Sequence, residues 1–263
     1  MNIKAITFGI LILISSLAFC QTESEINKTD QQGRKQGHWI KKYPNKSIVY
    51  DGIFKDDHPV GAFRRYDENN ILTSLLIYSE DGKEAIASIY HPNGYIASKG
   101  KYINQLKEGK WQFFSIAING HCINEEYYSK NLRNGISVRF YPDSTIAEKI
   151  TYVNDKKEGE WIQYYPGGVI SLRSSYLNDK VNGKYQVWFE NGSLEFSGIY
   201  KNDVRDGQWQ IYNSDGTIKY TMLYIDGVTK DRQMDIDVSN YLDLLEKNKG
   251  KIPDPEKAGI ILK

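Results

Sequence analysis

An aromatic residue returns about every 24 residues along most of this chain of 263 residues. The intervals between successive rings are 24, 24, 26, 24, 24, 24 and 24 residues. These anchor positions are Phe54, Tyr78, Tyr102, Tyr128, Tyr152, Tyr176, Tyr200 and Tyr224. A fixed period of this length is typical of proteins that stack copies of one small structural unit. The period therefore constrains the fold more than any other feature of the sequence.

A glycine and a second ring follow most anchors at fixed distances. The glycine comes seven residues after the anchor, and one further copy precedes Phe54. The repeat glycines are Gly37, Gly61, Gly109, Gly135, Gly159, Gly183 and Gly207. Two residues beyond them stand Trp39, Phe63, Trp111, Ser137, Trp161, Tyr185 and Trp209. About eight repeats therefore cover roughly residues 30–224.

Each repeat has the pattern of a β-hairpin. In residues 201–224, turn residues at Asn202-Asp203 and at Asp215-Gly216 surround two segments of alternating character, 208–212 and 217–224. An Asp-Gly pair favours a tight hairpin turn because both residues tolerate positive φ. Strands joined by short turns predict an all-β fold, an elongated antiparallel meander of about sixteen strands. At about 4.8 Å per strand, the array would be roughly 75 Å long.

Two local features of the repeats carry more specific predictions. Small residues recur on the second strand of the hairpin, where a neighbouring ring could lie flat over the backbone; these are Gly52, Gly100, Ser174 and Gly198. The third repeat has Ala85 and Ala87 in place of the glycine and the ring, and the fourth is longer by two residues before His121. These departures predict a local bend or bulge within residues 80–126.

The two ends of the chain differ from the repeats. Residues 1–20 combine Lys4, a short apolar run and small residues at the exit, a pattern that predicts a secretory signal peptide cleaved before Gln21. A lipid anchor on Cys20 is the less favoured alternative, because Phe19 is bulky where a small residue is usual. Residues 21–29 are polar and expected to be flexible. Residues 225–263 predict a C-terminal cap: a short helix over 237–250, N-capped by Asp237 or Ser239, covers the last strand, and an extended tail follows.

Charge and cysteine content exclude several classes of function. Removal of Lys4 with the signal would leave 33 basic residues against 33 acidic ones (34 minus 1, against 33), so no nucleic-acid partner is expected. No transmembrane segment is expected in the mature chain. Cys122 would be the only remaining thiol, which excludes an internal disulfide.

The repeat pattern resembles a known family. Residues 152–224 carry it best: Tyr152-Val-Asn-Asp is followed by Gly159 and Trp161, and Tyr200-Lys-Asn-Asp by Gly207 and Trp209. This pattern is similar to the bacterial variant of MORN repeats. The resemblance implies stacked β-hairpins and an interaction or scaffolding role, and it supplies no catalytic motif. Some proteins of this type are antitoxin-like, a role that an exported chain does not fit.

The search for chemistry favours a protein that is not an enzyme and needs no cofactor. The chain has none of the common nucleophile, phosphate-binding or zinc-protease motifs. His121 and Cys122 form, with Glu125 and Glu126, the only cluster of potential metal ligands or nucleophiles, and His91 in the preceding repeat could approach it. Their spacing matches no metal motif, so no metal site is predicted. Recurrent Asn-Asp pairs are interpreted as turn residues rather than calcium ligands.

The candidate binding residues are Trp111, Trp161, Trp209, His91 and His121. The recurring tryptophans are interpreted first as the core of a thin repeat protein and second as a surface for sugars or peptides. The predicted function is an exported, non-enzymatic protein-interaction or scaffold module at the bacterial cell envelope. A carbohydrate or cell-wall binding protein is the first alternative, and a self-assembling structural protein the second.

Overall fold

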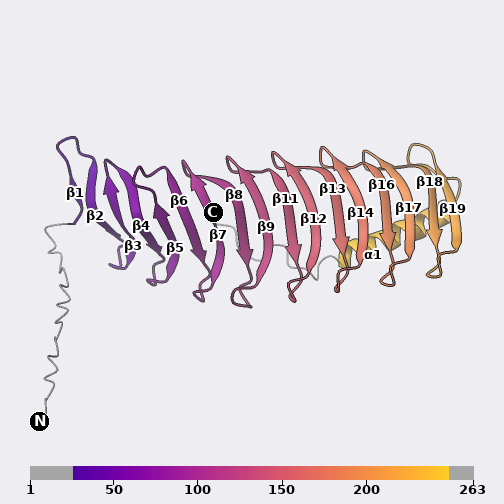
Figure 1. The fold of residues 1–263 in the computed structure, drawn as a ribbon, viewed down its shortest axis with the longest axis horizontal. Helices are drawn as coiled ribbons and strands as arrows, with labels where there is room; N and C mark the ends of the chain where they lie inside the picture. Colours follow the sequence, from indigo (N-terminus) through magenta and orange to yellow (C-terminus); the bar gives the residue numbers. More distant parts are fainter. Residues whose placement is uncertain (1–25, 249–263) are drawn as a thin grey trace, which may run out of the picture.

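The computed structural model describes residues 26–248 and contains one antiparallel β-sheet and one α-helix (Figure 1). Nineteen strands form the sheet, and the long strands follow one another in chain order, each pairing antiparallel with the long strand before and after it. Strands β1 (Lys28–Thr29), β10 (Leu132–Arg133) and β15 (Lys180–Val181) have two residues each. The remaining sixteen are the long strands of eight hairpins, so the predicted meander is confirmed. The predicted signal peptide and the tail after residue 248 lie outside the described residues.

The long strands in the N-terminal half are β2 (Lys35–Lys42), β3 (Ile48–Lys55), β4 (His58–Tyr66), β5 (Leu72–Tyr78), β6 (Glu84–Tyr90), β7 (Ile96–Ile103), β8 (Leu106–Phe114) and β9 (Cys122–Ser129). Those in the C-terminal half are β11 (Gly135–Phe140), β12 (Ile146–Val153), β13 (Lys156–Tyr164), β14 (Ile170–Leu177), β16 (Gly183–Trp188), β17 (Leu194–Lys201), β18 (Val204–Tyr212) and β19 (Ile218–Tyr224). The helix α1 (Arg232–Asn248) follows the last strand.

The Asn-Asp pairs form two-residue turns between consecutive strands, at one end of the strands. Both turn residues have positive φ, 49° and 67° at Asn154-Asp155 and 52° and 68° at Asn202-Asp203. Such turns match the twist of the flanking strands. The second turn residue also bonds to the preceding repeat: Asp155 Oδ1 accepts the Arg133 N–H at 2.8 Å, and the Asp155 N–H donates to the Arg133 carbonyl at 2.9 Å. These carboxylates stabilise contacts between repeats, which supports the turn interpretation over calcium binding.

A repeat glycine accompanies a register shift where β3 pairs with β4, β7 with β8, β12 with β13 and β17 with β18. Gly109 has a φ of +67°, and the pairing of β7 with β8 shifts register opposite it. The third repeat differs, because alanine at position 85 does not favour positive φ. Strands β5 and β6 therefore pair without a shift from Ser74↔Ile89 to Tyr78↔Ala85. No bulge therefore occurs at Ala85, although register shifts lie elsewhere in the predicted range, at 89–90, 99–101 and 113–114. The two additional residues lie in the 115–121 loop between β8 and β9.

The small residues on the second strand of each hairpin let rings lie against the backbone, as predicted. A Cβ atom added to Gly52, Gly100 or Gly198 would overlap the ring of Phe63, Trp111 or Trp209, respectively. At the fourth position, the hydroxyl of Ser174 donates to the Lys184 carbonyl at 3.0 Å.

The helix begins earlier than predicted and covers a different surface. Asp231 is the N-cap, since its Oδ1 accepts the Met234 N–H at 3.2 Å, so Asp237 and Ser239 lie inside the helix. Figure 1 shows α1 crossing behind β13–β19, on the face of the sheet rather than along its last edge. The predicted edge cap is therefore wrong, because Val238 and Leu242 join the hydrophobic cluster on the sheet face, where burial of their apolar side chains stabilises the contact. Within the described residues, no helix has the length and apolar character that a membrane crossing requires.

The start of the described chain is also held in place. Residues 26–29 fall in the stretch predicted to be flexible, but Lys28–Thr29 pairs with β2. The side chain of Asn27 bonds to the outer edge of the same strand, accepting the Ile40 N–H at 2.8 Å and donating to the Ile40 carbonyl at 3.1 Å. Edge pairing therefore orders these four residues.

Candidate binding face

One face of the sheet carries the repeated rings, and we call it the aromatic face. It comprises the anchor tyrosines, the rings that follow the repeat glycines and the residues between them on the same side of the strands. Several ring pairs meet edge to face, with centroids 4.9 Å apart for Tyr102–Trp111 and 5.2 Å for Tyr200–Trp209. Aromatic pairs favour this geometry, and the ladder joins neighbouring repeats.

The three tryptophans predicted as binding residues are buried in this ladder. Trp111, Trp161 and Trp209 are 1%, 3% and 1% exposed. Their indole N–H groups bond within the sheet, to the Lys101 carbonyl at 3.2 Å for Trp111 and to Glu148 Oε1 at 2.8 Å for Trp161. The rings therefore pack the core and offer no open face to a sugar.

The two histidines predicted as binding residues lie in neighbouring repeats but have different surroundings. His91 is 6% exposed, and its Nε2 donates to the Phe114 carbonyl at 3.1 Å. Tyr141 and Tyr165 make the same bond to the next repeat through their hydroxyls, so His91 occupies a structural position of the array. His121 lies on the 115–121 loop, with Nδ1 3.5 Å from the Ser144 hydroxyl.

The residues beside His121 do not form a metal site in the described part of the chain. Cys122 Sγ lies 3.4 Å from the Asn124 carbonyl, and burial raises the pKa of its thiol. A raised thiol pKa lowers the thiolate fraction that metals and electrophiles need. No group of three His, Cys, Asp or Glu side chains among residues 26–248 could hold a metal ion.

The aromatic face also carries a row of basic side chains that the sequence reasoning missed. Lys107 Nζ lies 4.7 Å from the Tyr128 ring centroid and 4.9 Å from that of Trp111. Equivalent cations over rings are Lys35, Arg133, Lys157 and Arg205. Each stands two residues before a repeat glycine, and this spacing is the sequence signal that could have revealed them. Each contact is stabilised by the attraction of a cation to the ring face.

Helix α1 divides the aromatic face into two parts of different polarity. Under and around the helix, Leu172, Val187, Phe196 and Ile211 supply apolar contacts. The same repeat positions in the N-terminal repeats are more polar. They hold Lys41, Arg65, Arg139, Ser74, Ser98, Asn124 and Glu148. The hydrophobic cluster of β5–β9 contains only strand residues, so no described residue outside the sheet covers it.

Polar contacts fix the position of the helix on the sheet. Asp235 Oδ1 accepts hydrogen bonds from Arg205 Nη1 and from the Tyr224 hydroxyl, both at 2.7 Å. The Tyr220 hydroxyl donates to Asp231 at the N-cap. Burial and the neighbouring Asp235 raise the pKa of Tyr224 to about 12, so this hydroxyl remains a donor at physiological pH. Arg205 thus contacts two rings, Trp209 and Tyr224, and one carboxylate of the helix.

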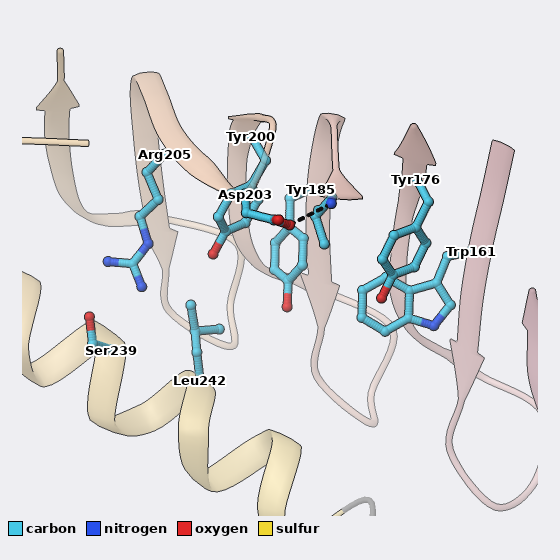
Figure 2. A pocket seen from close by; sticks show the side chains of 9 residues that line it. Trp161, Tyr176, Tyr185, Tyr200, Asp203, Arg205, Ser239 and Leu242 are labelled. Atoms are coloured by element: carbon cyan, nitrogen blue, oxygen red, sulfur yellow. Dashed lines mark hydrogen bonds between the residues drawn. The ribbon is translucent and has the colours of Figure 1, made fainter. Parts of the chain in front are cut away.

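A cavity of about 280 Å³ lies between α1 and the sheet. Figure 2 shows Trp161, Tyr176, Tyr185, Tyr200 and Arg205 pointing from the strands toward the helix, with Ser239 and Leu242 on the opposite side. The dashed line marks the hydrogen bond from the Val181 N–H to Asp203, a residue of the Asn202-Asp203 turn. The lining combines aromatic rings with Val181 and Leu242, and its charged side chains are Asp203 and Arg205.

Glu195 provides a pH-dependent contact on the other side of the helix. The residue is buried, and its Oε1 accepts the Tyr241 hydroxyl at 2.6 Å. Burial raises the pKa of the Glu195 carboxyl, and the bond from Tyr241 only partly opposes this. The folded protein therefore holds this proton to higher pH than the unfolded chain does, and the stabilisation is lost as pH rises through the raised pKa.

Glu195→Gln is expected to flatten this part of the pH dependence. Between about pH 4 and pH 7, the variant should lose less stability than the parent protein, because glutamine keeps an acceptor for Tyr241 without a charge. Thermal unfolding midpoints across this range measure the effect. The exposed Glu190→Gln in the same hairpin is the control, and equal profiles for the parent and Glu195→Gln would contradict the assignment.

The fold and this face define a single-layer antiparallel β-repeat protein. Residues 133–154, 157–178, 181–202 and 205–226 match the MORN repeat variant, so residues 133–226 consist of four consecutive copies of that repeat. This repeat is consistent with a binding or scaffold module. No curated protein matches the chain.

Several solved structures have limited similarity to the chain. TarM is 14% identical with a TM-score of 0.30, over 41% of this chain and 20% of its own. A mutant of S. aureus TarM in complex with Fondaparinux, alpha-GlcNAc-glycerol and UDP gives 14% and 0.30, over 42% and 21%. The pneumococcal O-GlcNAc transferase GtfA gives 14% and 0.26, over 37% and 18%. The chain thus matches only about a fifth of the length of these proteins.

Proposed function

We propose that this protein is a non-enzymatic interaction module, exported to the bacterial cell envelope, that binds another protein on the aromatic face of β2–β12. Export rests on the sequence of residues 1–20, which has the charged start, apolar centre and small-residue exit of a secretory signal. The mature chain would act as a rigid ribbon that holds its partner along the sheet.

The observation that carries the proposal is the packing of α1 on the aromatic face. The helix packs its apolar residues on the aromatic face of the C-terminal repeats, so the face accepts an amphipathic segment. The N-terminal repeats present the same arrangement of rings and cations. A partner segment would cover Leu76 and Ile123, which are partly exposed and pack against the cluster of β5–β9.

The two alternative functions have less support. Sugar binding through the tryptophan row would need exposed rings, and Trp111, Trp161 and Trp209 are buried. End-to-end assembly would need two free edges, and Asn27 already bonds to the N–H and carbonyl of Ile40 at the first edge.

Site-specific photo-cross-linking in envelope extracts tests the proposed function. A photoreactive residue at position 65 lies on the aromatic face, and one at the adjacent position 64 lies on the opposite face of the same strand, so Arg64 is a matched control for Arg65. We expect a cross-linked protein partner from position 65 and not from position 64. Absence of any cross-linked protein, or cross-links from position 64 alone, would contradict the proposal.

A further inference from the structure

We infer that the partner presents an acidic amphipathic helix, whose carboxylates meet the cations lying over the rings of the N-terminal repeats. The inference rests on the proposed function and specifies the chemistry of the binding segment. It is carried by the complete example that residues 26–248 contain, the contact of α1 with Arg205.

At Arg205 the structure shows how such a helix docks. The guanidinium lies over Trp209 and Tyr224, with its carbon 5.4 Å and 5.5 Å from the two ring centroids. The helix supplies Asp235, whose Oδ1 lies 2.7 Å from Arg205 Nη1. Apolar residues of the same helix, Val238 and Leu242, pack onto the neighbouring rings. One carboxylate and one apolar stripe therefore make the interface.

Two adjacent N-terminal repeats offer the same cation without a helix above it. Lys107 lies over Trp111 and Tyr128, and Arg133 lies 4.1 Å from the Tyr152 ring centroid. Arg133 is 29% exposed and also pairs with Asp155 at 3.1 Å. Lys35 repeats the arrangement over Trp39 and Phe54. Among the described residues, no helix covers these three positions.

The carboxylates beside these cations already form hydrogen bonds or ion pairs with other residues of the sheet. Glu126 accepts the Tyr128 hydroxyl and the Asn124 Nδ2 group, the latter at 3.0 Å. Glu148 accepts Trp161 Nε1 and pairs with Arg139 at 3.6 Å. Burial lowers the pKa of Lys107, although Glu126 opposes this shift. A carboxylate from a partner would stabilise the charged form of Lys107, so an acidic segment fits this surface and a basic one does not.

The geometry of the sheet sets the spacing of the carboxylates. Helix α1 crosses the strands, and neighbouring repeats lie two strands, or about 10 Å, apart. A helix rises about 1.5 Å per residue, so about seven residues separate positions that face Lys107 and Arg133. The binding segment should therefore carry an acidic residue about every seven positions beside its apolar stripe.

A synthetic helix tests this inference with the full-length protein. The probe is a labelled amphipathic peptide of about three heptads with glutamate at the heptad spacing, and its control carries glutamine instead. We expect the glutamate peptide to bind, to weaken as salt rises, and to lose at least about tenfold in affinity to Lys107→Gln/Arg133→Gln. The variant Lys110→Gln/Lys149→Gln removes two charges from the opposite face of β8 and β12 and should bind within about twofold of the parent.

A second variant separates charge from packing. Lys107→Arg keeps a cation over the rings and should retain binding, with circular dichroism and unfolding midpoints used to check the fold of every variant. Equal affinity for both peptides, or unchanged affinity in Lys107→Gln/Arg133→Gln, would overturn the inference. So would competition by a peptide of residues 249–263, because the chain itself would then be the occupant. A partner that is cross-linked from position 65 but binds Lys107→Gln/Arg133→Gln normally would leave the proposed function standing.

Discussion

Gly198→Ala should lower the free energy of unfolding by about 3 kcal/mol, at the upper end of the usual cost of overpacking. A Cβ at this position would overlap several atoms of the Trp209 indole, which is 1% exposed and has no room to move away. The ring is held by edge-to-face contacts with Tyr200 and Tyr224 and by the bond from its Nε1 to the Ile199 carbonyl at 3.2 Å. The backbone of β17 must therefore shift, and the pairing with β18 shifts with it.

Urea unfolding followed by tryptophan fluorescence and circular dichroism measures this effect. Ser197→Ala, on the opposite face of the same strand, is the control and should stay within about 0.5 kcal/mol of the parent. Gly100→Ala should reproduce the loss beside Trp111 in the N-terminal half. Unchanged stability in Gly198→Ala would contradict the close approach of ring and backbone.

Trp161→Ala should cost about 4 kcal/mol, within the range for removal of a large buried ring. The indole is 3% exposed and contacts Tyr176 and Tyr185 at centroid distances of 5.2 Å and 6.5 Å. Its removal opens a cavity in the ladder between two repeats. It also takes away the Nε1 donor that Glu148 Oε1 accepts at 2.8 Å, which leaves a buried carboxylate with fewer partners.

Trp161→Phe distinguishes these two causes, because it keeps most of the ring and removes only the N–H. It should cost less than the alanine variant, and Glu148→Gln in the same background should recover part of the loss. The control is Tyr127→Ala, which removes an exposed aromatic side chain on the opposite face. It should change the free energy of unfolding by less than about 1 kcal/mol. Trp161→Ala that keeps full stability while losing affinity for a sugar would instead support the carbohydrate alternative.

The sequence by itself determined the repeating architecture because the rules behind it are local. A 24-residue period, a turn pair such as Asn202-Asp203 and a small residue such as Gly198 each impose their geometry within one hairpin and its neighbour. The role of the tryptophans as core could also be predicted, since a single-layer sheet has little else to bury. The pairing at Ala85 could not be predicted in the same way, because losing the positive-φ glycine gives regular pairing there rather than a bulge.

The tertiary structure alone decided which surfaces are covered. The helical period of α1 fixes one apolar stripe but not the surface that receives it. In the structure this stripe packs on the aromatic face, and the helix does not run along the edge of β19. The position of a side chain such as His91 likewise depends on the carbonyl of Phe114, 23 residues away. The cations over the rings, from Lys35 to Arg205, line up on one face only when the repeats stack. A local pattern sets each hairpin, whereas packing between distant segments decides what remains open to a partner.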